Sequence, residues 1–232
     1  MLQSIKSTDQ VIIPARKNSK RFPNKNKTLL DGIPLIAHSI RYALEEGIPA
    51  TQIWVNSDDE DILQIASEYQ VETYSRDPLL AEDLTPTVAV LKDQLNFFEK
   101  NKIPCETVIL LQVTNPFRPK GELITFLRQF YASNRTSLCT FSPLNKKFGK
   151  IIEQRFTPEN YKPGQRMQDL EPRYYENGCI YISKSSLVHG GVIVGEDVFP
   201  VVLHDLLSTI DIDEIADLQL AEALLKSLNE NI

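Results

Sequence analysis

Cysteine is scarce in this sequence. The 232 residues include three cysteines, Cys105, Cys139 and Cys179, which lie far apart and form no C-x-x-C motif. An odd number of widely spaced thiols indicates neither a disulfide framework nor a zinc site. We therefore expect all three to be buried thiols that pack as small apolar side chains.

Long apolar runs are also missing. The longest, such as VILLQV at residues 108–113, fall far short of the roughly 20 residues that span a membrane. The first ten residues, MLQSIKSTDQ, lack the continuous apolar core of a signal peptide. The sequence therefore predicts no membrane partner and a cytoplasmic location.

The chain has no overall excess of positive charge, because its formal net charge is -6. Proteins that coat nucleic acid need a broad basic surface, so we expect no nucleic-acid partner. Positive charge is instead concentrated in VIIPARKNSKRFPNKNKTLLDG, residues 11–32, which contains no acidic residue before Asp31. A local cluster of this kind is typical of a cleft that binds a small polyanion.

Glycine is absent from this basic stretch until Gly32. That absence excludes a Walker A loop and a dinucleotide-binding fingerprint, since both depend on glycine backbone close to phosphate. Side chains would have to hold the anion, as guanidinium and ammonium groups can. The alternative is an ordinary solvated basic loop, but the stretch directly follows the first predicted strand, which favours a ligand.

Short β-branched runs alternate with helical patterns, which is typical of an α/β fold with a parallel sheet. Strands are expected at residues 9–15, 51–57, 71–75, 106–112, 136–141, 177–183, 191–195 and 199–204. Helices are expected at residues 33–47, 57–68, 87–100, 121–133 and 214–228, the second with a capping box from Ser57 to Glu60. We expect one domain over residues 1–232, with an irregular insertion within about residues 142–205.

Polar segments follow several of the predicted strands. They are residues 16–26, 76–87, 112–118 and 211–213. In open parallel sheets, ligands bind outside the carboxyl ends of the strands, where such loops meet. The sequence therefore predicts one site built from four separate segments.

Asp211 and Asp213 form a D-x-D pair near the end of the chain. Alternate residues of an extended segment share a face, and paired carboxylates bind a hard cation such as Mg²⁺. The alternative is that Asp213 caps the last helix. Gln112 and Arg118 also have two interpretations. Either they contact a polar ligand, or turn and charge contacts within their own loop explain them.

Several motifs together resemble the acylneuraminate cytidylyltransferases, the CMP-sialic acid synthetases and their relatives. The opening IIPARKNSKRFPNKN fits the family pattern I-P-A-R, two variable residues, S-K, then P and K-N. NSDDEDI, LLQVTNPFR, YYENGCIYI and IDIDEIADLQLAE are similar to later family motifs, so the likeness spans nearly the whole chain. It implies a Rossmann-like three-layer sandwich with a mostly parallel central sheet and a small dimerisation insertion.

The resemblance also implies a reaction, in which the anomeric hydroxyl of a sialic-acid-like sugar attacks the α-phosphate of CTP and releases pyrophosphate. The implied catalytic residues are Arg16, Lys20, Lys25 and Asp211. The implied nucleotide-binding residues are Arg16, Ser19, Lys20, Lys25, Asn26, Arg76, Thr85 and Thr87. Sugar binding is implied for Gln112, Tyr181, Arg166 and Lys147, and Mg²⁺ binding for Asp211 and Asp213.

The chain departs from the family pattern in three places. Val113 and Asn115 replace the usual proline and serine, and Met167 stands where the sugar-carboxylate arginine would align, with Arg166 beside it. Three cations of the basic stretch occupy positions that the family leaves variable, so we expect Lys17, Arg21 and Lys27 to be solvated.

Two other functions remain possible at this point. A metal-dependent glycosyltransferase also combines an α/β domain with D-x-D, although there the pair usually follows a mid-chain strand. A polyanion-binding module would lack any dependence on CTP. Within the family, the sugar acid could be N-acylneuraminate, its deaminated analogue KDN, legionaminate, pseudaminate or KDO. The resemblance further implies a homodimer.

Overall fold

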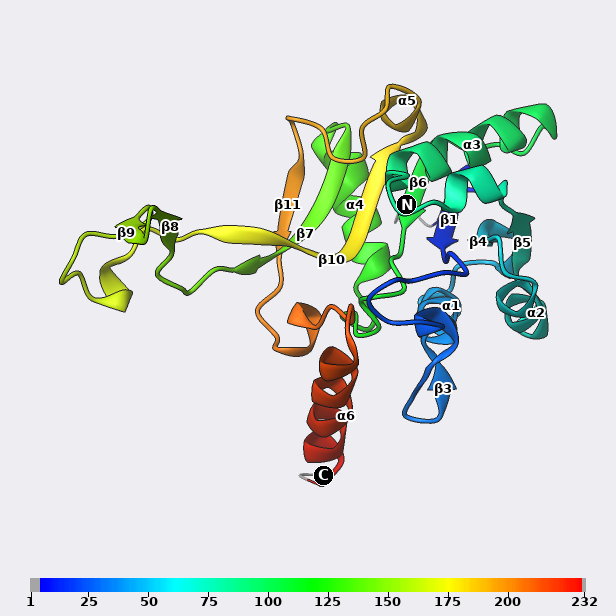
Figure 1. Ribbon diagram of the computed structural model, residues 1–232. Coiled ribbons are helices and arrows are strands. Elements are labelled where there is room, and N and C mark those ends of the chain that lie inside the picture. The colour runs from blue at the N-terminus through cyan, green and yellow to red at the C-terminus, as the bar shows by residue number, and fades with distance from the viewer. Residues whose placement is uncertain (1–4, 231–232) are drawn as a thin grey trace.

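The computed structural model describes residues 5–230, and its centre is a seven-stranded sheet of order β11-β7-β10-β6-β1-β4-β5 (Figure 1). All neighbouring strands are parallel except β10, which is antiparallel to both β6 and β7. The strands are β1 Asp9–Pro14, β4 Ile53–Ser57, β5 Glu72–Ser75, β6 Thr107–Leu110, β7 Ser137–Pro143, β10 Tyr174–Lys184 and β11 Phe199–Val202.

Helices cover both faces of this sheet. They are α1 Leu35–Glu45, α2 Glu60–Glu68, α3 Thr87–Lys100, α4 Leu123–Ser133, α5 Ser185–His189 and α6 Ile215–Glu230. Short pairs of strands, β2 Leu29–Leu30 with β3 Ile33–Pro34 and β8 Gly149–Ile152 with β9 Arg155–Pro158, form two small hairpins. Single turns of 3-10 helix lie at η1 Lys25–Lys27, η2 Ala50–Gln52, η3 Pro78–Ala81, η4 Met167–Asp169 and η5 Leu207–Thr209.

Alternation of apolar side chains along β1 divides the core in two. Val11 and Ile13 face the larger core, which α1, α2, α4 and α6 also line, whereas Ile12 faces the smaller core beneath α3 and α5. Because successive side chains of a strand point to opposite faces, a central strand buried on both sides must be apolar throughout. The three-layer sandwich predicted from the sequence is confirmed.

Two local predictions are wrong. Residues 191–195 form no strand, because Val192 and Gly195 donate their backbone N–H groups to Leu187 and to the Ser137 hydroxyl instead of to a sheet neighbour. The N-cap of α2 is Asp59, whose carboxylate accepts from the backbone N–H of Asp61 at 3.0 Å. No helix within the described range is long and apolar enough to cross a membrane.

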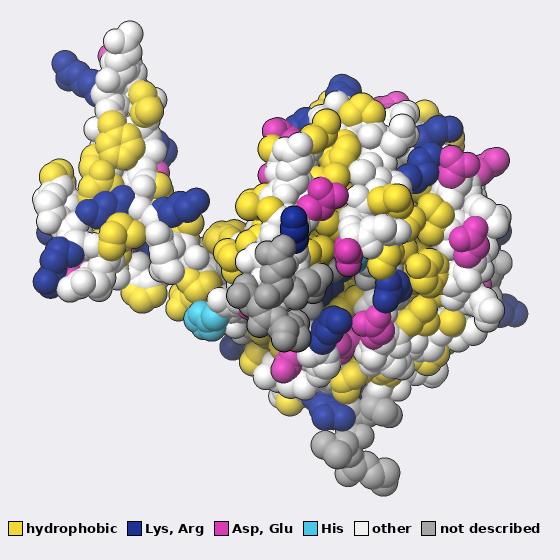
Figure 2. All heavy atoms as spheres, turned by 90° about the horizontal axis from the view of Figure 1, so that it is seen from below, with side chains coloured by type: hydrophobic (Ala, Val, Ile, Leu, Met, Phe, Trp, Pro, Cys, Tyr) yellow, Lys and Arg dark blue, Asp and Glu magenta, His cyan; other side chains and the backbone are white. Residues whose placement is uncertain are grey.

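An arm leaves the body of the protein between β7 and β10 (Figure 1). It contains the β8–β9 hairpin and η4, and it accounts for much of the region that the sequence predicts to be irregular; the remainder forms β10, α5 and β11. Figure 2 shows hydrophobic side chains over the surface of this arm. The large exposed apolar residues there are Ile151, Ile152, Phe156 and Met167.

Candidate functional site

A cavity of about 500 Å³ lies over the carboxyl ends of β1, β4, β5 and β6. Its walls come from the four segments that the sequence predicts to meet at the strand ends. The geometry therefore agrees with the predicted convergence. The lining residues include Arg16, Ser19, Lys20, Arg21, Lys25, Asn26, Arg76, Glu82, Asp83, Thr85, Thr87, Gln112, Val113, Thr114 and Asp213. Cationic side chains outnumber acidic ones among them, as a polyanion site requires.

The basic loop folds back on itself at one wall of the cavity. The Asn26 side-chain amide donates to the Arg16 carbonyl oxygen at 2.9 Å, which ties η1 to the end of β1. Lys25 and Asn26 are both buried, whereas Asn24 before them is exposed and Lys27 after them is half-buried. A lysine ammonium held this far from solvent needs an anionic partner, since burial of an unpaired charge is unfavourable.

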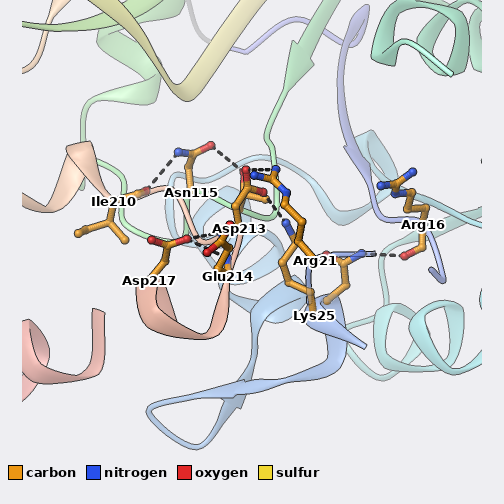
Figure 3. Close-up of polar contacts among 10 residues, drawn as sticks. Arg16, Arg21, Lys25, Asn115, Ile210, Asp213, Glu214 and Asp217 are labelled. Carbon is orange, nitrogen blue, oxygen red and sulfur yellow. Dashed lines mark hydrogen bonds and ion pairs between the residues drawn. The ribbon is translucent and has the colours of Figure 1, made fainter. Parts of the chain in front are cut away.

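Two carboxylates distant in sequence pair with these cations. Lys25 Nζ lies 2.8 Å from Asp213 Oδ1, and Arg21 pairs with the other oxygen of Asp213 (Figure 3). Arg16 and Lys20 lie 2.9 and 2.6 Å from the two oxygens of Asp83. The hydrogen bond from Lys20 lowers the pKa of Asp83 below its ordinary value, so Asp83 is ionised at neutral pH.

The acidic pair near the C-terminus is held against the end of β6. The Ile212 backbone N–H donates to the Thr114 carbonyl at 2.8 Å, and the Asp217 carboxylate accepts from the N–H groups of Asp213 and Glu214 (Figure 3). The helix-cap alternative for Asp213 is therefore wrong, because its side chain bonds to Arg21 and Lys25 instead.

The two aspartates differ in their protonation behaviour. Partial desolvation raises the pKa of Asp211, the Thr114 hydroxyl opposes this shift, and the negative charge of Asp213 adds to it. Desolvation also acts upward on Asp213, but hydrogen bonds and charges from Lys25 and Arg21 leave the pKa of that carboxyl below its ordinary value. Asp211 thus has the more basic carboxylate of the pair.

Gln112 lies at the end of β6 with its side chain against β10. A Cβ on Gly178 would lie 3.0 Å from Gln112 Oε1 and 2.5 Å from Asn115 Oδ1, and Gly178 has a φ of +81°. Only glycine fits both the backbone and the space at this position. The Asn115 amide bonds to the Asn177 and Ile210 carbonyls, so this departure from the family pattern supports the fold behind the cavity.

The Arg118 side chain forms its hydrogen bonds with the protein and not with the cavity. Its guanidinium donates to the carbonyls of Cys179 and Gln112 and to the Ser39 hydroxyl. Burial lowers the pKa of Arg118 to about 10. Arg118 does not line the cavity, and within residues 5–230 it pairs with no carboxylate. Its bond to the Gln112 carbonyl closes the loop between these two residues, which agrees with the alternative of a loop held together by its own contacts.

The loop over the far end of the cavity begins at Arg76. Arg76 as a whole is 5% exposed. Its guanidinium donates through Nε to the Asn56 side-chain oxygen at 2.5 Å and through a terminal nitrogen to the Asn56 carbonyl at 2.7 Å. Desolvation lowers the pKa of Arg76 to about 10. Thr85 and Thr87 line the same end of the cavity.

Three residues with a predicted sugar-binding role lie away from this cavity. Tyr181 is half-buried on β10, and its hydroxyl bonds to Glu176 at 3.4 Å. Arg166 and Lys147 are exposed on the arm, where they bond to Asp169 and to the Gln165 carbonyl respectively.

Two cations that the sequence predicts to be solvated form ion pairs, and one acid of the cavity is not predicted. Arg21 lines the cavity and pairs with Asp213, although its side chain is 63% exposed. Lys27 pairs with Asp59 and Asp61, and its side chain is 24% exposed. Asp83 was not recognised as the partner of the basic loop. Its neighbours LAED in the sequence carry no signal of that pairing.

Comparison with known proteins now identifies the family. A family model described as cytidylyltransferase matches residues 10–226. The chain belongs to the cytidylyltransferase family. Its match covers the basic loop, the loop from Arg76 and both C-terminal aspartates, so every wall of the cavity lies within the family's extent.

Relatives in this family have different sugar acids in their names. The CMP-N,N'-diacetyllegionaminic acid synthase of Legionella pneumophila is 32% identical, over 93% of this chain and 95% of that protein. The pseudaminic acid cytidylyltransferase of Campylobacter jejuni is 30% identical, over 95% and 97%. The N-acylneuraminate cytidylyltransferase of Streptococcus agalactiae is 33% identical over 74% of this chain, but the match spans 42% of that longer protein.

Solved structures with low sequence identity share the fold. CMP:2-keto-3-deoxy-manno-octonic acid synthetase, solved with CTP, superposes with a TM-score of 0.68 over 94% of this chain and 98% of that one, at 17% identity. A glucose-1-phosphate thymidylyltransferase from Bacillus anthracis gives 0.65 over 93% and 94%, at 14% identity. This likeness concerns the fold alone.

Asp83 competes with any phosphate ligand for Arg16 and Lys20, which leads to a prediction. Asp83→Asn should increase the affinity for inorganic tripolyphosphate about threefold to tenfold, measured by isothermal titration calorimetry, because two cations lose their protein anion. Glu82→Gln is the matched control, since Glu82 lines the same cavity and forms no ion pair in the described part of the chain. Equal effects of the two variants would show that only the general charge of the cavity matters.

Proposed function

We propose that this cytidylyltransferase transfers CMP from CTP to the anomeric hydroxyl of a nonulosonic acid, with N-acylneuraminate as the first candidate, and releases pyrophosphate. The cavity carries this proposal, because it gathers Arg16, Lys20 and Lys25 around a space that can take a triphosphate. Three relatives support the substrate class. They are 30–33% identical, and each is named as a CMP synthase or cytidylyltransferase of such an acid.

The reaction would proceed by direct displacement at the α-phosphate. Such a displacement needs the nucleophile in line and the developing charge neutralised, and fixed cations supply both without a covalent intermediate. In this proposal Arg16, Lys20 and Lys25 hold the triphosphate and the departing pyrophosphate, with Ser19 and Asn26 beside them. When CTP binds, these three cations exchange the carboxylates of Asp83 and Asp213 for phosphate oxygens.

Mg²⁺ is the cofactor of this proposal, and the acidic pair fits it. Mg²⁺ commonly takes one or two carboxylates together with phosphate oxygens and water. Asp211 forms no ion pair within residues 5–230, and its hydrogen bond with the Thr114 hydroxyl leaves further lone pairs on its carboxylate for a metal. When bound, Mg²⁺ would neutralise phosphate charge and increase the acidity of the sugar hydroxyl. In this proposal Asp211, the more basic of the two aspartates, or a bound water accepts the hydroxyl proton.

The remaining residues of the cavity would bind the base of CTP and the sugar acid. The segment from Arg76 through Thr85 and Thr87 would bind the cytosine, and Gln112 would contact the sugar acid. Legionaminate, pseudaminate, KDN and KDO remain candidate sugars, since such acids differ at groups that a few pocket residues contact. A metal-dependent glycosyltransferase is disfavoured because the cytidylyltransferase match includes the D-x-D pair within the family's own extent.

A homodimer is the proposed assembly, and the arm would form its interface. Ile151 and Phe156 are 75% and 51% exposed there, which is unusual for large apolar side chains grouped on a protruding hairpin. In such a dimer, Arg166 and Lys147 would lie close to the neighbouring subunit, because both are on the arm. We also propose a cytoplasmic location, which agrees with three free thiols.

Pyrophosphate release tests the proposed activity. With CTP, Mg²⁺ and a panel of nonulosonic acids, release should depend on both the nucleotide and the acid, with N-acylneuraminate the most active. CTP without any acid is the control. Release that needs no acid, or that requires a sugar phosphate as acceptor, would contradict the proposal.

Asp211→Ala should lower turnover by at least about a thousandfold while the melting temperature stays close to that of the parent protein, because the residue is exposed and carries no structural ion pair. Glu214→Ala is the matched control, since it removes a neighbouring exposed carboxylate. If the Asp211 variant keeps its rate, the metal-binding role of that residue is wrong.

Sedimentation velocity should give a dimer for the parent protein and a shift toward monomer for Phe156→Asp, because a buried charge at an apolar interface is unfavourable. Val192→Asp places the same charge on an exposed apolar residue outside the arm and should leave the dimer intact. A monomeric parent protein, or identical behaviour of the two variants, would remove the arm from the interface.

A further inference from the structure

Arg76 is a buried cation whose hydrogen bonding is incomplete. It pairs with no carboxylate in the described part of the chain, and its two hydrogen bonds both go to Asn56. A guanidinium has five N–H donors, so these two bonds leave donors for a ligand in the cavity that Arg76 lines. A ligand acceptor at this position would take up donors that the two bonds to Asn56 leave unused.

A chain of side-chain amides fixes the position of this guanidinium. Arginine can only donate, so the Asn56 side-chain oxygen must face Arg76 and its amide nitrogen must point the other way. That nitrogen donates to Gln94 Oε1 on α3 at 2.8 Å. Both amides are completely buried, and their orientations therefore follow from the Arg76 contact.

The main chain of Asn56 ties the same position to the basic loop. Its carbonyl accepts from the Ala15 N–H at 2.9 Å as well as from Arg76, and the Arg76 N–H donates to the Ser57 carbonyl. Ala15 directly precedes Arg16. The end of β4 thus holds the start of both the basic loop and the loop from Arg76, which sets the distance between the two ends of the cavity.

Gln94 is more than a packing residue in this arrangement. It lies beside the apolar residues Leu91 and Leu95 of the smaller core, yet its side-chain nitrogen has no partner within residues 5–230. An apolar side chain of similar size would avoid that unfavourable burial. The amide is therefore explained by what it holds, namely the orientation of Asn56.

We propose that Asn56 and Gln94 are positioning residues that hold Arg76 in place to select cytosine over uracil. This inference rests on the proposed function, in which the segment from Arg76 binds the base. Cytosine presents two adjacent acceptors, N3 and O2, whereas uracil keeps the O2 acceptor but presents an N3–H donor beside it. A fixed group that only donates matches the first pattern and opposes the second, and buried donors left unpaired discriminate strongly.

The test compares the dissociation constants of CTP and UTP by titration calorimetry, which needs no sugar acid and no turnover. Asn56→Leu should lower the preference for CTP about tenfold, and Gln94→Leu about threefold, because Arg76 then samples several orientations. Asn56→Asp should keep the preference, since its carboxylate still accepts from Arg76 and the Gln94 amide can rotate to donate to it.

Gln52→Leu is the matched control. Gln52 is another buried amide, and it bonds to the Lys6 and Asp9 carbonyls near the opposite end of the sheet. Its replacement removes both of these hydrogen bonds and should lower the melting temperature at least as much as Gln94→Leu does, without changing the CTP preference. This comparison separates positioning from a general loss of stability.

The outcomes are distinguishable. If the parent protein shows no preference for CTP, the proposed function fails. If the parent prefers CTP but Asn56→Leu and Gln94→Leu keep that preference, the inference about positioning is overturned and the proposed function stands. If Asn56→Leu does not fold, the contrast between Gln94→Leu and Asn56→Asp still decides.

Discussion

The ion pairs between the basic loop and two distant acids are the interaction on which the site depends. Lys25 bonds to Asp213, which lies 188 positions further along the chain. The loop brings several cations together at one edge of the sheet, and like charges so close are stable only beside anions. In the protein alone Asp83 and Asp213 provide them, and in the proposed reaction the phosphates of CTP take over much of that role.

The sheet makes this arrangement possible. Parallel strands end at a common edge, so loops far apart in the sequence meet there without long connections. Asn56 at the end of β4 accepts from both Ala15 and Arg76, and Thr114 beyond β6 accepts from Ile212. Backbone hydrogen bonds to strand ends therefore fix the phosphate end, the base end and the acidic pair relative to one another.

Sequence predicted the layers of the fold well because the relevant signals are local. The apolar run from Val11 to Ile13 predicts a strand buried on both faces, and the apolar pattern of α3 predicts a helix. Both patterns depend on neighbouring residues alone. The apolar run at residues 191–195 was misleading, since a strand also needs a partner and its N–H groups bond elsewhere. Strand propensity cannot specify which edge is free.

The site was predictable only in part for the same reason. The spacing of the basic loop resembles the family and identified Arg16, Lys20 and Lys25, but the pairing of Asp83 or Arg21 is a tertiary contact with no local pattern. The most direct test of the account uses CTP labelled at the α-phosphate, incubated with Mg²⁺ and N-acylneuraminate. The label should appear in a CMP-sugar while the released pyrophosphate is unlabelled; label that stays in CTP, or that appears in pyrophosphate, would contradict transfer of CMP.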